Sequence, residues 1–303
     1  MGTEVDATPL ELVNEVKIAA LLGGKMSERH EASGIHFKDG FLYVVFDNDP
    51  YIVRLKPDLS RAREDREVIY LREGSVGYED LTYQPFEKRW YCLLEALEYR
   101  AGEFRPRIDE FDESFHLIEH YWLEFPLDHS NKGIEGLATL RLQGNDYLLG
   151  LCEGNNCEGG KAGRQPGNGR IQVFRRDSDE WRQVSTIRLP EHLPFEDYSS
   201  LALNDRFMTV ISQRSSALWV GKIRQNATSL DDLFEDAGYL FTFPRDDEGR
   251  IIYGNLEGVA WIGDGRVALV SDRSKPHDEP RRCEEKDQSV HIFKLPDDFE
   301  RPT

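Results

Sequence analysis

Short apolar runs separated by polar turns recur along the whole chain. One clear example starts at Asn255, continues through an apolar run to Trp261, turns at Asp264-Gly265, and resumes as a second apolar run that ends at Asp272. Runs of this length that are rich in β-branched and aromatic residues and bounded by Gly, Asp, Asn or Pro predict β-strands. A tight Asp-Gly turn between two such runs predicts a hairpin.

These predicted strands fall into five successive groups. Four groups contain four strands each, and the fifth contains three. The groups begin close to residues 33, 78, 134, 198 and 255. Repeated four-stranded units are typical of a β-propeller, in which each unit forms one blade. The sequence therefore predicts an all-β fold, a five-bladed β-propeller.

The N-terminal region offers the strand that the fifth group lacks. Residues 15–22 form an apolar run whose period is compatible with either a helix or a strand. Pairing as the outer strand of the last blade would close the ring and remove two exposed sheet edges. We therefore predict a closing strand at residues 14–22, a flexible segment at 1–13, and a single β-propeller domain over residues 1–303.

Composition limits the classes of partner. Of the 303 residues, 39% are hydrophobic, which is enough for a sizeable core, and the formal net charge is −18. Because so acidic a chain repels phosphate backbones, we expect no nucleic-acid binding. We see no apolar leader and no run long enough to span a membrane. We expect no membrane association and a cytoplasmic protein, or a secreted one if a signal peptide has been removed.

The four cysteines do not indicate a zinc site. Cys152 and Cys157 are close enough in sequence to close a small disulfide loop, and the sequence leaves their state open. Their spacing differs from the C-x2-C pairs of zinc sites, and no histidine is near them. Four cysteines are also too few for a disulfide scaffold.

The first residues of the five innermost strands fall in register when the groups are aligned. In a propeller these strands line the central axis, so their first residues should face one another. Facing carboxylates repel unless some are protonated or a cation lies among them. Carboxylates and hydroxyls suit calcium, which takes 6–8 oxygen ligands, and the lack of thiol or imidazole disfavours zinc or copper. The predicted calcium ligands are Ser33, Glu79, Glu135, Ser199 and Glu257. The alternative is a hydrated channel in which the glutamates accept hydrogen bonds from backbone amides.

The order Ser, Glu, Glu, Ser, Glu, one per blade, resembles the calcium-activated nucleotidase (apyrase) family of five-bladed propellers. The strings at residues 198–200 and 256–258, and the hairpin at 39–43, are similar to that family's blade starts. The resemblance implies a central calcium and hydrolysis of nucleoside di- and triphosphates. The first-blade loop, residues 47–50, differs from the family because it lacks the Asp-Arg pair associated with the substrate site.

The loops that join second to third strands should open on the same face as these glutamates. They are rich in arginine, whose planar fork suits phosphate, sulfate or carboxylate. An acid beside a metal-bound water can act as a general base. The candidate bases are Asp47, Glu153 and Asp272. The candidate anion-binding residues are Arg100, Arg107, Arg164, Arg214, Arg273 and Lys275. The alternative is that these loops are simply polar and their arginines pair with neighbouring acids.

Two functions remain open at this point. The first is a calcium-dependent hydrolase of phosphate esters or anhydrides. The second is a non-catalytic binding module with structural calcium that recognises a small anionic ligand or a protein partner. Propellers support both, so the fold does not decide between them.

Overall fold

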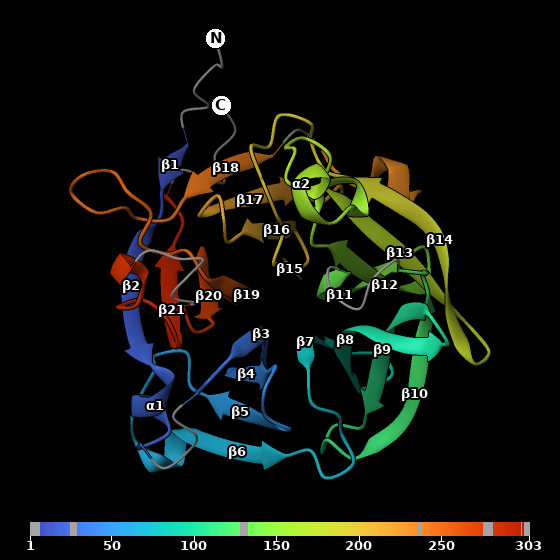
Figure 1. Cartoon of the computed structure of the whole chain (residues 1–303), viewed down its shortest axis with the longest axis horizontal. Coiled ribbons are helices and arrows are strands. Elements are labelled where there is room, and N and C mark those ends of the chain that lie inside the picture. The colour runs from blue at the N-terminus through green and yellow to red at the C-terminus, as the bar shows by residue number, and fades with distance from the viewer. Residues whose placement is uncertain are drawn as a thin grey trace.

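The computed structural model describes residues 7–24, 29–127, 133–235, 238–274, 281–297 and 299. Strands dominate it, and the helices that it describes are single turns, so the fold is all-β. Hydrogen bonds group the strands into four sheets, which surround a common centre (Figure 1).

The first two sheets contain the strands from β3 to β14. One sheet has the order β3-β4-β5-β6, with bounds Ala32–Lys38, Phe41–Phe46, Tyr51–Leu55 and Arg66–Tyr70. The other has eight strands in the order β11-β12-β13-β14-β10-β9-β8-β7. In chain order, β7 to β10 span Tyr78–Gln84, Arg89–Arg100, Glu103–Phe111 and Leu117–Glu124. Strands β11 to β14 span Ile134–Leu142, Asn145–Cys152, Arg170–Asp177 and Glu180–Arg188. A parallel pairing of β10 with β14 joins its two antiparallel halves.

The last two sheets each include an N-terminal strand. The third has the order β1-β18-β17-β16-β15, and the fourth has the order β19-β20-β21-β2. In the third, β15 to β18 span Ser200–Leu203, Phe207–Ser212, Ala217–Lys222 and Tyr239–Thr242, and β1 is Thr8–Pro9. In the fourth, β19 to β21 span Leu256–Gly263, Arg266–Ser271 and Ser289–Lys294, and β2 is Glu11–Lys17.

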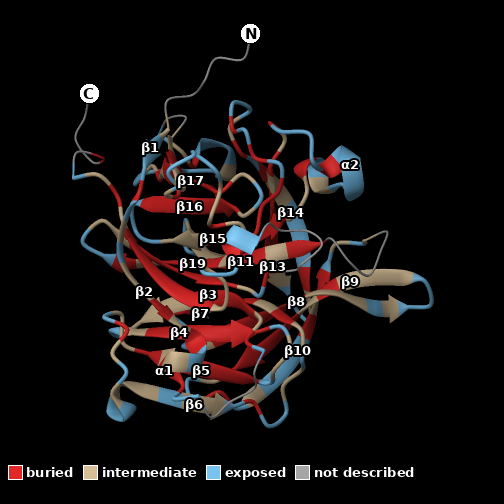
Figure 2. Cartoon of the chain, turned by 60° about the vertical axis from the view of Figure 1, so that its left-hand side comes forward, coloured by how far each residue is buried: buried red, intermediate tan, exposed pale blue. Residues whose placement is uncertain are grey.

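The five innermost strands form a ring. Each of β3, β7, β11 and β15 contacts the next innermost strand in chain order, and β19 contacts β3 (Figure 1). Apolar side chains fill the spaces between neighbouring sheets, and the strands nearest the centre are buried (Figure 2). Trp90, for example, is 1% exposed and packs between Tyr43 and Phe115, with ring centroids 4.7 and 5.0 Å away.

The N-terminal segment differs from the sequence prediction in its boundaries. Strand β2 covers Glu11–Lys17, and Ile18–Leu21 forms a helical turn, α1, where the predicted strand at 14–22 would have continued. Residues 8–13 are not a loose segment, because β1 pairs with β18, Leu10 is 3% exposed, and β2 already begins at Glu11. The sequence was ambiguous here because Ile18 and Leu21 are buried in the same core as the strands, so apolar pattern alone did not separate strand from helix. Residues 1–6 lie outside the described part of the chain.

A buried polar cluster attaches β2 to the strand beside it. The Glu15 carboxylate accepts a hydrogen bond from Lys286 Nζ at 2.5 Å and lies 3.0 Å from His291 Nδ1. His291 Nε2 lies 3.0 Å from Ser271 Oγ. Serine, histidine and glutamate thus follow the order of a catalytic triad, but Ser271 is 2% exposed and His291 is fully buried. The Ser271 hydroxyl also donates to the Lys286 carbonyl at 2.7 Å, so we assign the cluster a structural role.

We predict that Glu15→Gln weakens this attachment in a pH-dependent way. Burial raises the pKa of Glu15, but His291 and Lys286 outweigh it and lower that pKa from 4.5 to about 2. Because the folded-state pKa is lowered, the stabilisation is present above pH 4.5 and is lost as the pH falls from 4.5 toward 2. At pH 7, Glu15→Gln should lower the free energy of unfolding in urea by about 2 kcal/mol.

The control variant is Glu11→Gln, an exposed position on the same strand, which should change stability little. The idea fails if both variants unfold at the same urea concentration, or if the Glu15→Gln deficit persists unchanged near pH 2.

Candidate functional site

Four of the five residues predicted to form the central ring are the extra residues of β-bulges. Ala32 pairs with Phe46 and Gly34 pairs with Val45, so Ser33 is the inserted residue in β3. The pairings of β7, β11 and β19 shift in the same way at Glu79, Glu135 and Glu257. Ser199 directly precedes β15. A bulge bends the strand and changes the direction of a side chain, which explains how these residues can leave the regular pleat.

Carboxylates gather around Glu79 and Glu135. Burial raises the pKa of Glu79 well above its ordinary value, and the nearby charges of Asp47, Glu95, Glu257 and Asp272 raise it further. Burial likewise raises the pKa of Glu135, followed by the charges of Glu95, Glu79, Glu153 and Glu257. We call this group the acidic centre: Asp47, Glu79, Glu95, Glu135, Glu153, Glu257 and Asp272.

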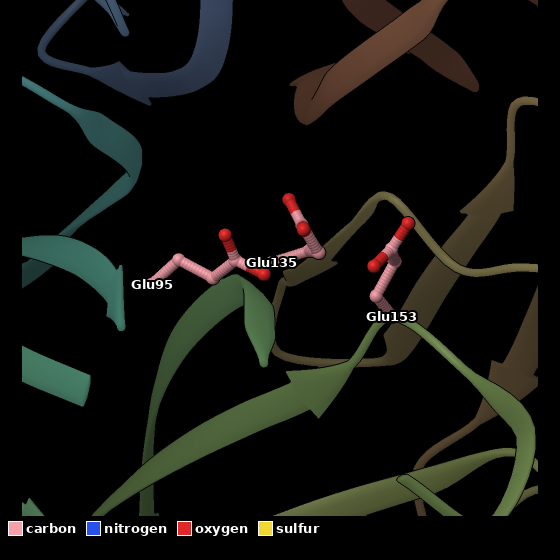
Figure 3. Close-up of side chains that lie close together, drawn as sticks. All are labelled: Glu95, Glu135 and Glu153. Atoms are coloured by element: carbon pink, nitrogen blue, oxygen red, sulfur yellow. The ribbon is translucent and has the colours of Figure 1, made fainter. Parts of the chain in front are cut away.

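Three of these carboxylates lie close enough to share one ion. Glu95, Glu135 and Glu153 each offer an oxygen, and the three oxygens lie within 4.8 Å of one another (Figure 3). Calcium binds oxygen at 2.3–2.6 Å, so two ligands on opposite sides of the ion are about 5 Å apart. The donor set is entirely oxygen, which fits calcium or magnesium better than zinc or copper. The residues present therefore fit a hard divalent cation.

The acidic centre has a second source of carboxylates besides the ring. In four sheets or half-sheets, the second strand has one residue that pairs with the inner strand immediately before the bulge: Phe46, Leu94, Cys152 and Ser271. The next residue along the chain is in each case an acid: Asp47, Glu95, Glu153 and Asp272. Asp47, Glu153 and Asp272, the candidate bases predicted from the sequence, all lie beside ring glutamates. Glu95 is not among the predicted residues, because the sequence pattern predicts a loop at residues 95–107. Aligning the residue that follows each second strand would have identified it.

The two ring serines connect neighbouring strands. Ser33 Oγ donates to the carbonyl of Tyr78, and Ser199 Oγ donates to the carbonyl of Leu256 at 2.7 Å. Both serines are buried. Each hydroxyl oxygen retains acceptor lone pairs, so these bonds do not exclude the serines as ligands.

The residues one position after each ring residue fill the axis of the molecule with side chains and close backbone contacts. Asp80 is 1% exposed and accepts hydrogen bonds from the amides of Leu81 and Leu137, both at 2.8 Å. Ser200 Oγ donates to Asp80 at 3.4 Å and accepts from the Val259 amide at 3.3 Å. A Cβ on Gly34 would lie 2.6 Å from Asp80 Oδ1, so only glycine fits there. We call Asp80 and Ser200, with the glycines at 34, 136 and 258, the axial plug.

The cationic residues predicted for the mouth do not all lie in loops. Residues 95–107 form a protruding hairpin of β8 and β9, not the expected loop (Figure 2). Arg107 lies on β9, and its Nε donates to the buried Asp109 at 2.9 Å. Arg100 lies at the hairpin tip over the ring of Tyr99, 4.8 Å from its centroid. Arg273 is exposed beside Asp272, and Lys275 lies outside the described residues.

Arg164 and Arg214 lie beside one residue of the acidic centre, Glu153. With Glu153 they line a depression of about 30 Å³, which holds roughly one water molecule. Arg214 Nε is 3.9 Å from the Asp197 carboxylate, so the Arg214 charge is partly neutralised by an ion pair within the protein. A much larger cavity, about 710 Å³, lies instead at the opposite ends of the inner strands. None of the carboxylates of the acidic centre lines that larger cavity.

A disulfide holds the loop that begins at Glu153. Cys152 and Cys157 are bonded, which answers the question that the sequence left open. Between them, the buried Asn155 donates to the carbonyls of Gly163 and Phe195 at 2.9 and 3.0 Å. The glycine-rich stretch after it contains one helical turn, α2 (Gly160–Gly163). The backbone on either side of Glu153 is therefore held, by the disulfide at Cys152 and by the hydrogen bonds of Asn155.

A scan against protein-family models and a search of curated proteins both return no match. Among solved structures, the chain is similar to a glutaminyl cyclase from Myxococcus xanthus, with 12% identity and a TM-score of 0.50 over 94% of this chain and 96% of that chain. It is also similar to the PQQ-bound aldose sugar dehydrogenase from Streptomyces coelicolor, with 12% identity and a TM-score of 0.48 over 94% and 97%.

These comparisons bear on the fold alone. The likeness to the glutaminyl cyclase structure covers nearly the whole chain and supports a propeller-like all-β fold. Nothing in the comparisons supports the apyrase resemblance, which stays a hypothesis. Separately, none of the helices in the described residues is long and apolar enough to cross a membrane.

We predict that the axial plug is a major source of stability. Asp80→Ala would leave the buried amides of Leu81 and Leu137 without their acceptor, which should lower the free energy of unfolding by about 3 kcal/mol. Urea denaturation measures the effect, and Asp247→Ala, at an exposed turn, is the matched control. Equal midpoints for the two variants would show that Asp80 does not tie the inner strands together.

Proposed function

We propose that the chain is a five-bladed β-propeller. The blades would be β3–β6, β7–β10, β11–β14, β15–β18, and β19–β21 with β2 as their outer strand. Support comes from the ring of five innermost strands and from the antiparallel order within each group. In this arrangement the parallel β10–β14 pair joins the outer edges of two neighbouring blades, which accounts for the eight-stranded sheet.

We further propose that the acidic centre binds a calcium ion. The observation that carries this proposal is that Glu79 and Glu135 are each partly buried and each lie near four other carboxylates. Without a cation, such a group must take up protons or repel. Glu95, Glu135 and Glu153 have the spacing of ligands around one ion. The remaining acids and the two ring serines, which lie at the starts of inner strands or directly after second strands, would complete the oxygen shell.

With the ion in place, the mouth becomes a site for a small anionic ligand. Arg164 and Arg214 lie beside Glu153, where a guanidinium fork can bind phosphate or carboxylate oxygens. We favour a binding role in which calcium is structural, because a depression with room for about one water cannot enclose both a substrate and an attacking water; an anionic ligand would bind at its rim.

A phosphohydrolase is the second candidate, and the same neighbours support it. A bound calcium ion would supply a Lewis acid for a phosphoryl oxygen. Glu153 would then accept a proton from the attacking water, and Arg164 and Arg214 would hold the anionic oxygens. Asp47 and Asp272 lie on the other side of the acidic centre, beside Glu79, and are alternative bases.

Calcium should stabilise the protein through Glu135. At a concentration 100-fold above its Kd, calcium should raise Tm by about 5 °C, and EDTA should reverse the rise. Glu135→Gln removes one carboxylate and should lose most of the shift. Glu64→Gln, an exposed position on the outside of the first sheet, should keep it. Differential scanning calorimetry gives the values, and a Tm that ignores calcium and EDTA would rule out the site.

A substrate panel separates the two functions. Nucleoside phosphates, phosphomonoesters and pyrophosphate are assayed with calcium and with EDTA. A hydrolase should release phosphate only with calcium, and Glu153→Gln should slow that release by at least 100-fold. If calcium raises Tm but no substrate turns over, the binding role stands and the hydrolase is eliminated.

A further inference from the structure

A large cavity lies at the ends of the inner strands that are remote from the acidic centre. Its volume is about 710 Å³, within the range of small-molecule sites. All five inner strands contribute to its lining, starting two positions after each ring residue. These first lining residues are buried and apolar and form a floor: Ile35, Leu81, Leu137, Leu201 and Val259.

The axial plug separates this cavity from the acidic centre. Asp80 on β7 and Ser200 on β15 are each 1% exposed or less. On its own strand, each lies between the ring residue before it and the apolar floor residue after it. Their hydrogen bonds to Leu137 and Val259 close the space between neighbouring strands. A molecule in the cavity therefore cannot contact an ion held by the ring glutamates.

Aromatic and aliphatic side chains form the walls of the cavity. Phe37, Tyr83, Leu203 and Trp261 lie around the floor and are partly exposed. Phe86 at the rim is 65% exposed, a high value for so large an apolar side chain. A concave surface of this composition favours an apolar ligand.

Three polar side chains at the rim, those of Arg141, Arg224 and Tyr83, have partners within the protein. Arg141 bonds both oxygens of Asp146 at 3.1 Å, and Arg224 Nε lies 3.0 Å from Asp232. Tyr83 donates its hydroxyl proton to Glu113 at 2.8 Å. A charged ligand would have to compete with these pairs, whereas an uncharged one leaves them intact.

We propose that this cavity binds an uncharged, mainly apolar small molecule, of the size of a two- or three-ring compound. The ligand stacks against Tyr83 and Trp261 and rests on the apolar floor. This site is distinct from the proposed calcium site and does not depend on it.

The test uses N-phenyl-1-naphthylamine, a neutral dye whose emission rises in apolar surroundings. The full chain should bind it saturably with one site per protein. Leu203→Trp places a large ring in the cavity and should weaken binding at least tenfold. Val184→Trp adds the same side chain at an exposed position on β14 and should leave Kd within twofold of the unmodified protein.

Two further measurements keep the result decisive. If circular dichroism shows that Leu203→Trp is misfolded, Ala202→Phe fills the cavity from the adjacent position. EDTA and calcium should leave the dye affinity unchanged, because the axial plug lies between the two sites. The proposal is overturned if binding is not saturable, if folded cavity-filling variants bind the dye normally, if calcium shifts the dye affinity, or if anionic 1-anilinonaphthalene-8-sulfonate binds more tightly.

Discussion

The Asp80 carboxylate is the constraint on which the centre of this molecule depends. It accepts hydrogen bonds from its own strand, from β11 and from β15, and Ser200 extends the network to β19. Gly34 on β3 approaches the same carboxylate so closely that a Cβ would clash with it. One buried side chain thus fixes the relative heights of all five inner strands. That register determines which residues lie at the same level of the axis.

Two adjacent residues, Glu79 and Asp80, show opposite solutions to burying a carboxylate. Burial raises the pKa of both. Around Asp80 the neighbours are amide and hydroxyl donors, which favour the charged form. Around Glu79 the neighbours are carboxylates, which oppose it. The first arrangement is complete within the protein. The second needs a cation or protons, and this difference is the physical reason to place an ion one level above the plug.

The sequence predicts the ring residues because the repeat places one of them at the same point of each inner strand. It predicts the all-β fold for a related reason, since strand and turn signals recur. It does not predict Glu95, because β8 extends past Leu94 only through pairing with β9. It also misassigns Arg107, whose partner Asp109 becomes visible only when a strand places both side chains on one face. Bulges, strand ends and ion-pair partners depend on pairing across strands, and a single sequence does not record that pairing.

At the start of each inner strand, three consecutive residues lie at three successive heights along the central axis. The triplets are Ser-Gly-Ile, Glu-Asp-Leu, Glu-Gly-Leu, Ser-Ser-Leu and Glu-Gly-Val. The first position is a carboxylate of the acidic centre or a serine that bonds the neighbouring strand, the second is small or part of the plug, and the third is the apolar floor of the cavity. Because the plug is both polar and fully bonded, it isolates a strongly charged end from an apolar end within a few ångströms. Substitutions at the first or third position can therefore change one end of the molecule without disturbing the other, whereas a change at the second affects both.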